Sequence, residues 1–364
     1  MIAKVTQLTL SLAATAILMT SCSKDDDDNG YKIPSTYNFE NASYSGQIQR
    51  LDMLDEITSY MKTVVNGDIV DANQLKTMYA NDNFIWTNTE LNGSTKQLKN
   101  KTFPGESSNI EGWMEVLALA SASPNVGSNG TPGIVTSGDG AKKYLFDANG
   151  MEPVQMIEKG LMGSCFYYNG ITEYLSPTKM DVENDEFAEG KTYTDMQHHW
   201  DESFGYLAAP TDISDDNIAD YDDLRFWGKY MKKAHDGGLN TVDNIMSAYI
   251  SGRAAIDNKD YNQRDKEIAN IQKEWEIIIA TTAIHYLNGA ISDFADDAKR
   301  NHQLSESYAF ISGLKYNASK TISDSQIALV LSSLGQNFYE ISVADITDAK
   351  NVLGTAFNLN VDNF

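Results

Sequence analysis

Apolar residues along most of this chain recur at spacings of three and four, the period of one buried face of an α-helix. The pattern is clear over residues 48–65 and stops at Asn66 and Gly67, residue types that often end helices. It predicts further helices over residues 72–80, 111–122, 153–175, 193–209, 222–234, 241–256, 264–294, a segment starting near 301, 323–334 and 344–357. Alternation typical of strands is scarce, and residues 123–140 have the Gly, Pro, Ser and Asn content of a surface loop. The sequence therefore predicts an all-α fold.

One pattern occurs twice. Residues 198–207 and 302–311 both read H-x-x-x-E-S-[FY]-[GA]-[YF]-[LI], and a long apolar helix containing an Asn-Gly pair precedes each copy. The internal repeat covers about residues 153–209 and 266–318. We therefore expect a duplicated helical bundle in which two helix pairs are related by pseudo-symmetry.

The repeated pattern supplies the candidate functional residues. His198 and Glu202 are four positions apart, as are His302 and Glu306, so each pair lies on one face of its helix. If the two helices pack with their pairs together, two imidazoles and two carboxylates would suit zinc or iron. In the alternative, each histidine donates a hydrogen bond to its glutamate within a buried polar network. The sequence leaves both alternatives open.

Three further residues have side chains that could bind a metal or act as a nucleophile. His285 lies on the apolar stripe of the helix before the second copy, and it could add a metal ligand. His199 adjoins the first pair and is otherwise expected at the surface. Cys165 lies within an apolar helical pattern, which is typical of a small buried residue rather than of a nucleophile.

Signatures of common enzymes are missing from the sequence. It contains no H-E-x-x-H, G-x-S-x-G, P-loop or G-x-G-x-x-G string. Binding is therefore expected more than catalysis, and the pattern assigns no catalytic residue.

The N-terminus predicts export. Residues 1–21 have a weakly basic start, an apolar stretch too short to span a bilayer and small residues before Cys22. This arrangement resembles a bacterial lipobox, which implies cleavage before Cys22 and lipidation of its thiol. The acidic tether at residues 22–36 resembles the surface-export signals of some lipoproteins. We therefore expect a cell-envelope protein that is lipid-anchored to the outer membrane and exposed at the surface. The alternative is an ordinary signal peptide followed by a disordered acidic run.

Composition narrows the range of partners. The chain is 41% hydrophobic and has a net charge of −23; because residues 1–21 contain one Lys and no acid, residues 22–364 carry −24. This charge argues against nucleic acid as a partner, since phosphates require a basic face. Residues 37–364 are long enough for one large helical domain.

Three segments, together with the lipoprotein signal, resemble a known family. They are residues 45–56 (S-G-Q-x-x-R-L-x-M-L-D-E), 158–163 (E-K-G-L-M-G) and 302–306 (H-x-L-S-E). They resemble an uncharacterised family of bacterial surface lipoproteins that is itself similar to the imelysin-like proteins. The resemblance covers about residues 36–364 and implies a duplicated helical bundle with a link to iron acquisition. The imelysin His-x-x-Glu motif corresponds to His199 and Glu202, but Gln197 stands where that family has Gly.

These observations favour a surface-anchored, helical binding lipoprotein that serves the acquisition of iron or an iron chelate. Two alternatives remain. One is a metal-dependent hydrolase or peptidase of the imelysin type, with zinc or iron as its cofactor. The other is a non-catalytic scaffold that binds neighbouring surface proteins.

Overall fold

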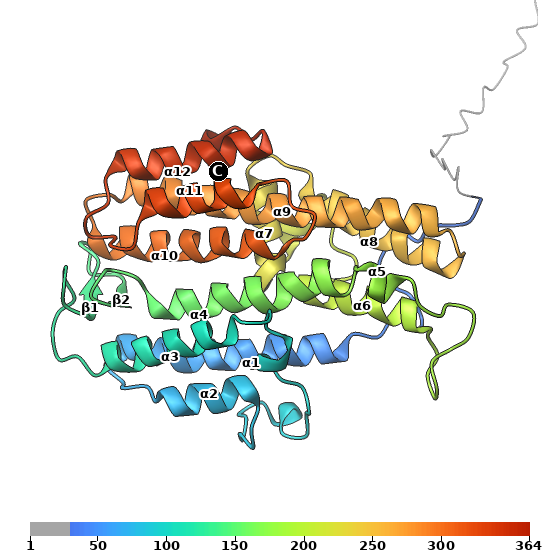
Figure 1. Ribbon diagram of the computed structural model, residues 1–364, viewed down its shortest axis with the longest axis horizontal. Coiled ribbons are helices and arrows are strands. Elements are labelled where there is room, and N and C mark those ends of the chain that lie inside the picture. Colours follow the sequence, from blue (N-terminus) through green and yellow to red (C-terminus); the bar gives the residue numbers. More distant parts are fainter. Residues whose placement is uncertain (1–29) are drawn as a thin grey trace, which may run out of the picture. The chain divides into compact units, whose positions relative to one another are not determined.

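Helix α9 (Tyr261–Ser292) is the longest element, and the C-terminal half of the fold packs around it (Figure 1). The structure is a computed structural model that describes residues 30–364, in which Pro34–Phe364 form one compact unit. Residues 278–280 of α9 are fully buried, as expected for a segment that is apolar on every side. Four helices contact α9: α7 (Phe226–Asp236), α8 (Thr241–Asp257), α10 (Asp297–Gly313) and α12 (Val343–Phe357).

A second layer is built on α4 (Pro153–Leu161), which continues without a break into a π-helix at Met162–Glu173. Helix α4 contacts α10 on one side and α1 (Ser45–Lys62) and α3 (Ser107–Ser121) on the other (Figure 1). The π-helix approaches α10 closely, because a Cβ added to Gly163 would lie 3.1 Å from the Cα of Gly313. A side chain at Gly163 would therefore crowd the backbone of α10.

Shorter helical segments complete the fold. The α-helices among them are α2 (Ala72–Ala80), α5 (Pro177–Met180), α6 (Asp195–Leu207) and α11 (Asp324–Leu334). The 3-10 helices are Thr63–Asn66, Thr89–Leu91, Lys99–Lys101, Ile218–Asp220, Leu314–Tyr316 and Val361–Asn363. Thr194, Ser323 and Ser342 form capping boxes that start α6, α11 and α12.

The helical fold class is confirmed, and each predicted helix has a counterpart in the structure. The predicted loop at 123–140 is wrong in part. Gly133–Thr136 (β1) pairs antiparallel with Lys143–Phe146 (β2), with Gly133 opposite Phe146. Strands of four residues are too short for an alternating pattern to be distinctive. Packed helix pairs occur at both halves of the predicted repeat, while the duplication itself stays a prediction.

The predicted signal segment and Cys22 lie outside the described residues. Within residues 30–364, no helix combines the length and the apolar character needed to cross a membrane.

Cys165 is buried in the π-helix, as its sequence context predicts. Burial raises the pKa of its thiol to about 12, so the reactive thiolate is scarce at neutral pH. We expect iodoacetamide to modify Cys165 only when the protein is unfolded in denaturant, as measured by mass spectrometry of the peptide that contains it. Rapid modification of Cys165 in the folded protein would show that the π-helix opens.

Candidate functional site

His302, in the second copy of the repeated pattern, is enclosed between two carboxylates. Its Nδ1 lies 2.5 Å from Glu152 Oε2, and its Nε2 lies 3.6 Å from Glu306 Oε2. The ring stacks on Tyr144 of β2 with 4.2 Å between the ring centroids. Burial opposes protonation, but the charge and hydrogen bond of Glu152 and the charge of Glu306 outweigh it and raise the pKa of His302 above 6.5. The two carboxylates therefore favour the protonated form of this ring.

Glu306 continues this arrangement into a row of alternating charges. Its Oε1 lies 3.6 Å from Lys159 Nζ, which donates a 2.8 Å hydrogen bond to Glu158. Glu158 in turn lies 3.6 Å from Lys62 Nζ. The side chains of Lys159 and Glu306 are only 6% and 7% exposed, so the row crosses the interior between α1, α4 and α10.

The contribution of His302 to stability should depend on pH. Because its pKa is higher in the folded state, the contribution is complete below the unfolded value near 6.5 and is lost as pH rises through the folded pKa. We expect His302→Gln to lower the free energy of unfolding most at about pH 6, with a difference that shrinks toward about pH 9. Urea unfolding of both proteins across this range measures it. A difference that is constant or grows with pH would contradict a raised pKa of His302 in the folded state.

His198, in the first copy, has different surroundings. Its Nδ1 lies 2.9 Å from the backbone carbonyl of Ser43, which can only accept, so Nδ1 carries the proton. In the neutral ring, Nε2 is then an unprotonated acceptor, and it lies 3.9 Å from Glu202 Oε1. The ring stacks on Tyr193 with 4.5 Å between centroids, and the side chain is 30% exposed. His198 and Glu202 line a groove of about 450 Å³ whose lining also includes Lys96.

Glu202 is fixed in position by two neutral donors. Its Oε1 accepts hydrogen bonds from Gln47 Nε2 at 2.9 Å and from the Tyr174 hydroxyl at 3.0 Å. The Tyr174 oxygen accepts a further bond from Lys101 Nζ at 2.8 Å. Burial lowers the pKa of Lys101, which reflects the cost of enclosing its charge beside this network. The carboxylate of the first copy is therefore positioned by hydrogen bonds, whereas that of the second copy is positioned by charge.

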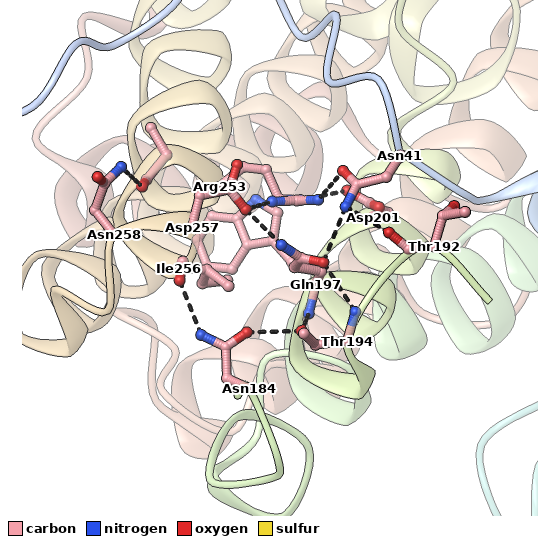
Figure 2. A network of polar contacts seen from close by, with 12 residues as sticks. Asn41, Asn184, Thr192, Thr194, Gln197, Asp201, Arg253, Ile256, Asp257 and Asn258 are labelled. Carbon is pink, nitrogen blue, oxygen red and sulfur yellow. Dashed lines mark hydrogen bonds and ion pairs between the residues drawn. The ribbon is translucent and has the colours of Figure 1, made fainter. Parts of the chain in front are cut away.

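The segment before α1 contributes Ser43 to the lining of the groove. This segment is held by a polar cluster, which Figure 2 shows. Residues 37–43 are called the N-terminal strap below. Arg253 donates to Asp201 through Nε at 3.1 Å and to Asn41 through Nη2 at 2.8 Å. Asp201 also accepts from the Tyr37 hydroxyl at 2.6 Å and from the backbone N–H of Ser43 at 3.1 Å. The Arg253 and Asp201 side chains are fully buried. The cluster therefore fixes the carbonyl that selects the tautomer of His198.

Both copies hold the segment that precedes another helix. In the first copy, Asp201 accepts from Ser43 N just before α1. In the second, the Ser305 hydroxyl accepts from Glu152 N at 2.8 Å just before α4. Asp201 and Ser305 occupy the same position of the repeated pattern, one residue before the glutamate. The pattern thus has a structural role in each half of the fold, in addition to any role in binding.

The two His/Glu pairs do not meet at one centre. The contacts of His198 and His302 share no residue. Among residues 30–364, no group of three or more His, Cys, Asp or Glu side chains could hold a metal ion. The residues present therefore do not fit a resident zinc or iron cofactor, and no reaction step through such a metal is derived. Neither histidine is within hydrogen-bond distance of its own glutamate, since the separations are 3.9 and 3.6 Å.

The other two candidates lie apart from the groove. His199 is half-buried, and its Nδ1 lies 2.8 Å from the carbonyl of Lys179. His285 is exposed, and its Nε2 lies 2.9 Å from Lys233 Nζ, so its expected place on the core stripe was wrong. A stripe that steps by 3.5 residues drifts about 20° per heptad around an α-helix. Accordingly, Trp275 is buried in the middle of the stripe and His285 has turned toward solvent.

Sequence reasoning missed several groups that define the two sites. Tyr144 stacks on His302 from a segment for which no element was predicted. Tyr193 stacks on His198 from the start of a predicted helix. Glu158 and Lys159 could have been found from the sequence, because two charged residues inside an otherwise apolar helix predict a buried ion pair. Glu152 and Ser43 had no local signal, since their roles come from distant contacts.

The fold and these contacts define a helical protein with one enclosed and one groove-facing His/Glu pair. The chain belongs to a family described as a domain of unknown function, DUF4856, which matches residues 34–336 and so includes both pairs. No curated protein and no solved structure matches the chain significantly. The similarity to imelysin-like proteins stays a prediction.

Proposed function

We propose that this protein is a lipid-anchored, non-catalytic binding protein of the cell envelope, whose ligand occupies the groove at His198. One observation carries the proposal. The Nε2 acceptor of His198 and the Glu202 carboxylate face a groove, whereas the equivalent pair His302 and Glu306 is saturated by charged neighbours. Of the two pairs, His198 and Glu202 are therefore the one that a ligand could reach.

The proposed ligand class is a chelated iron ion. Nε2 and the carboxylate oxygen can supply at most two protein donors at this point. A bare ion needs four or more ligands, but a chelate brings most of its own donors and needs few from the protein. The groove is also lined by Lys96 and Lys191, whose ammonium groups suit the anionic oxygens of a chelator. Glu189 and Asp195 at the same groove would disfavour a ligand of uniform negative charge.

Calorimetric titration of the full chain with ferric citrate tests this proposal, with citrate alone and Zn²⁺ as comparison probes. We expect ferric citrate to bind, His198→Ala to weaken it at least about tenfold, and the matched variant His199→Ala to bind as the unchanged protein does. Helicity of each variant is checked by circular dichroism. Equal binding of citrate alone, or full affinity in folded His198→Ala, would overturn the proposal. Peptide cleavage that depends on added Zn²⁺ would instead support the hydrolase alternative.

The anchor is a separate part of the proposal and has its own test. The lipobox-like residues before Cys22 and the acidic tether support it. We expect the wild-type protein to fractionate with membranes and Cys22→Ser to be released from them. Membrane association that survives Cys22→Ser would contradict a lipid anchor at this residue, without affecting the ligand titration.

A further inference from the structure

A second groove, separate from the one at His198, lies between α3 and α10 with α4 as its floor. It has a volume of about 650 Å³, within the range of small-ligand sites. In Figure 1, α4 lies between α10 and α3. Its lining includes Trp113 of α3, Tyr308 of α10 and Tyr316. Gly112 and Gly160 also line the groove, where the absence of side chains keeps it open.

Several polar groups in this groove have no hydrogen bond to the described part of the chain. They are the indole N–H of Trp113, the hydroxyl of Tyr308 and the side-chain amides of Asn149 and Gln336. Each can donate, and the hydroxyl and amides can also accept. The groove therefore combines aromatic surfaces with unused hydrogen-bonding groups of both kinds.

The charges around the groove do not favour an ion as ligand. Lys315 is the cation of its lining, and its Nζ lies 2.8 Å from Glu106 Oε1. Asp147 accepts from the backbone N–H groups of Asn149 and Met151 at 2.8 and 2.9 Å. An anionic ligand would face two carboxylates with its one possible cation already paired. A wholly apolar ligand would leave the free indole, hydroxyl and amide groups without partners.

We propose that this groove binds a neutral oligosaccharide. The aliphatic C–H face of a sugar ring is apolar and can lie against the electron-rich faces of Trp113 and Tyr308. Its hydroxyls both donate and accept, which matches the unused indole, hydroxyl and amide groups around it. The occupant is thus an uncharged ligand with alternating apolar and hydroxyl surfaces, in contrast to the charged chelate proposed for the groove at His198.

Trp113 reports on this groove without a label. The other four tryptophans of the chain, Trp86, Trp200, Trp227 and Trp275, are each at most 2% exposed, whereas Trp113 is partly exposed. The full chain is titrated with maltotriose, cellotriose, mannotriose and chitotriose while tryptophan emission and acrylamide quenching are followed. Trigalacturonic acid is the anionic comparison. We expect at least one neutral trisaccharide to shift the emission and protect Trp113 from acrylamide, and trigalacturonic acid to do neither.

Matched variants locate the binding. Trp113→Ala should weaken the active trisaccharide at least about tenfold by calorimetry, and Trp113→Phe should retain part of the affinity. Leu119→Ala changes a 76% exposed residue of the same helix and should bind as the unchanged protein does. Flat titrations with all four sugars, equal binding of trigalacturonic acid, or full affinity in Trp113→Ala would overturn the proposal. The ferric citrate titration is independent of these results, because His198 lies in the other groove.

Discussion

Replacing Lys159 with Met should lower the free energy of unfolding by about 3–5 kcal/mol, as expected when one partner of a buried ion pair is removed. Lys159 lies between Glu158 and Glu306, and the side chains of all three are at most 10% exposed. Their charges raise the pKa of Lys159 despite its burial. Methionine keeps most of the side-chain volume, so the loss reports charge rather than packing. Urea unfolding monitored by circular dichroism at about pH 7 measures it.

A second variant distinguishes charge from shape at this position. Lys159→Met leaves the Glu306 carboxylate buried without its nearest ammonium group. Adding Glu306→Gln removes that uncompensated charge, so the double variant should recover part of the lost stability. Additive losses in the double variant would show that Lys159 and Glu306 do not interact.

We expect Arg253→Met to have a comparable effect, about 3–5 kcal/mol, because it strands the fully buried carboxylate of Asp201. Asp201 would keep its hydrogen bonds from Tyr37 and Ser43, which replace only part of the ion pair. The variant should also increase amide hydrogen exchange in the N-terminal strap, since Arg253 bonds Asn41 directly. Denaturant unfolding and peptide-resolved hydrogen exchange are the two measurements.

An exposed ion pair provides the control for this variant. Lys259 pairs with Asp185, and the two side chains are 54% and 73% exposed. Lys259→Met should leave the free energy of unfolding nearly unchanged, because water and salt screen an exposed pair. Equal effects of Lys259→Met and Arg253→Met would mean that burial does not govern the strength of these pairs.

The positions of the helices could be predicted because they are determined by residues within each helix and at its ends. Helix α2 was predicted at its observed bounds, and α11 and α12 within one residue, since periodicity and capping residues lie within each segment. The strands β1 and β2 were missed, because a four-residue hairpin is stabilised by contacts that its own sequence does not display. The π-helix at Met162–Glu173 was predicted as α-helix, because a segment that is buried on most sides shows no periodicity that distinguishes the two.

The candidate site was predictable only as residue types on two helices. Spacing placed His198 with Glu202 and His302 with Glu306 on common faces. Whether each pair is enclosed depends on the group that contacts its histidine. For His198 this group is the backbone carbonyl of Ser43, and for His302 it is the carboxylate of Glu152. Such partners, about 150 residues away in sequence, follow from the tertiary fold alone.

The N-terminal strap has a mechanical consequence. A pull applied at residue 34 would travel along the strap and reach the Arg253 cluster before it reached the first turn of α1. The hydrogen bonds of Tyr37, Asn41 and Ser43 all end on Arg253 or Asp201, so the load on them would be passed to this one ion pair. Since the carbonyl of Ser43 also contacts His198, tension on the strap would reach the groove at His198 through this contact.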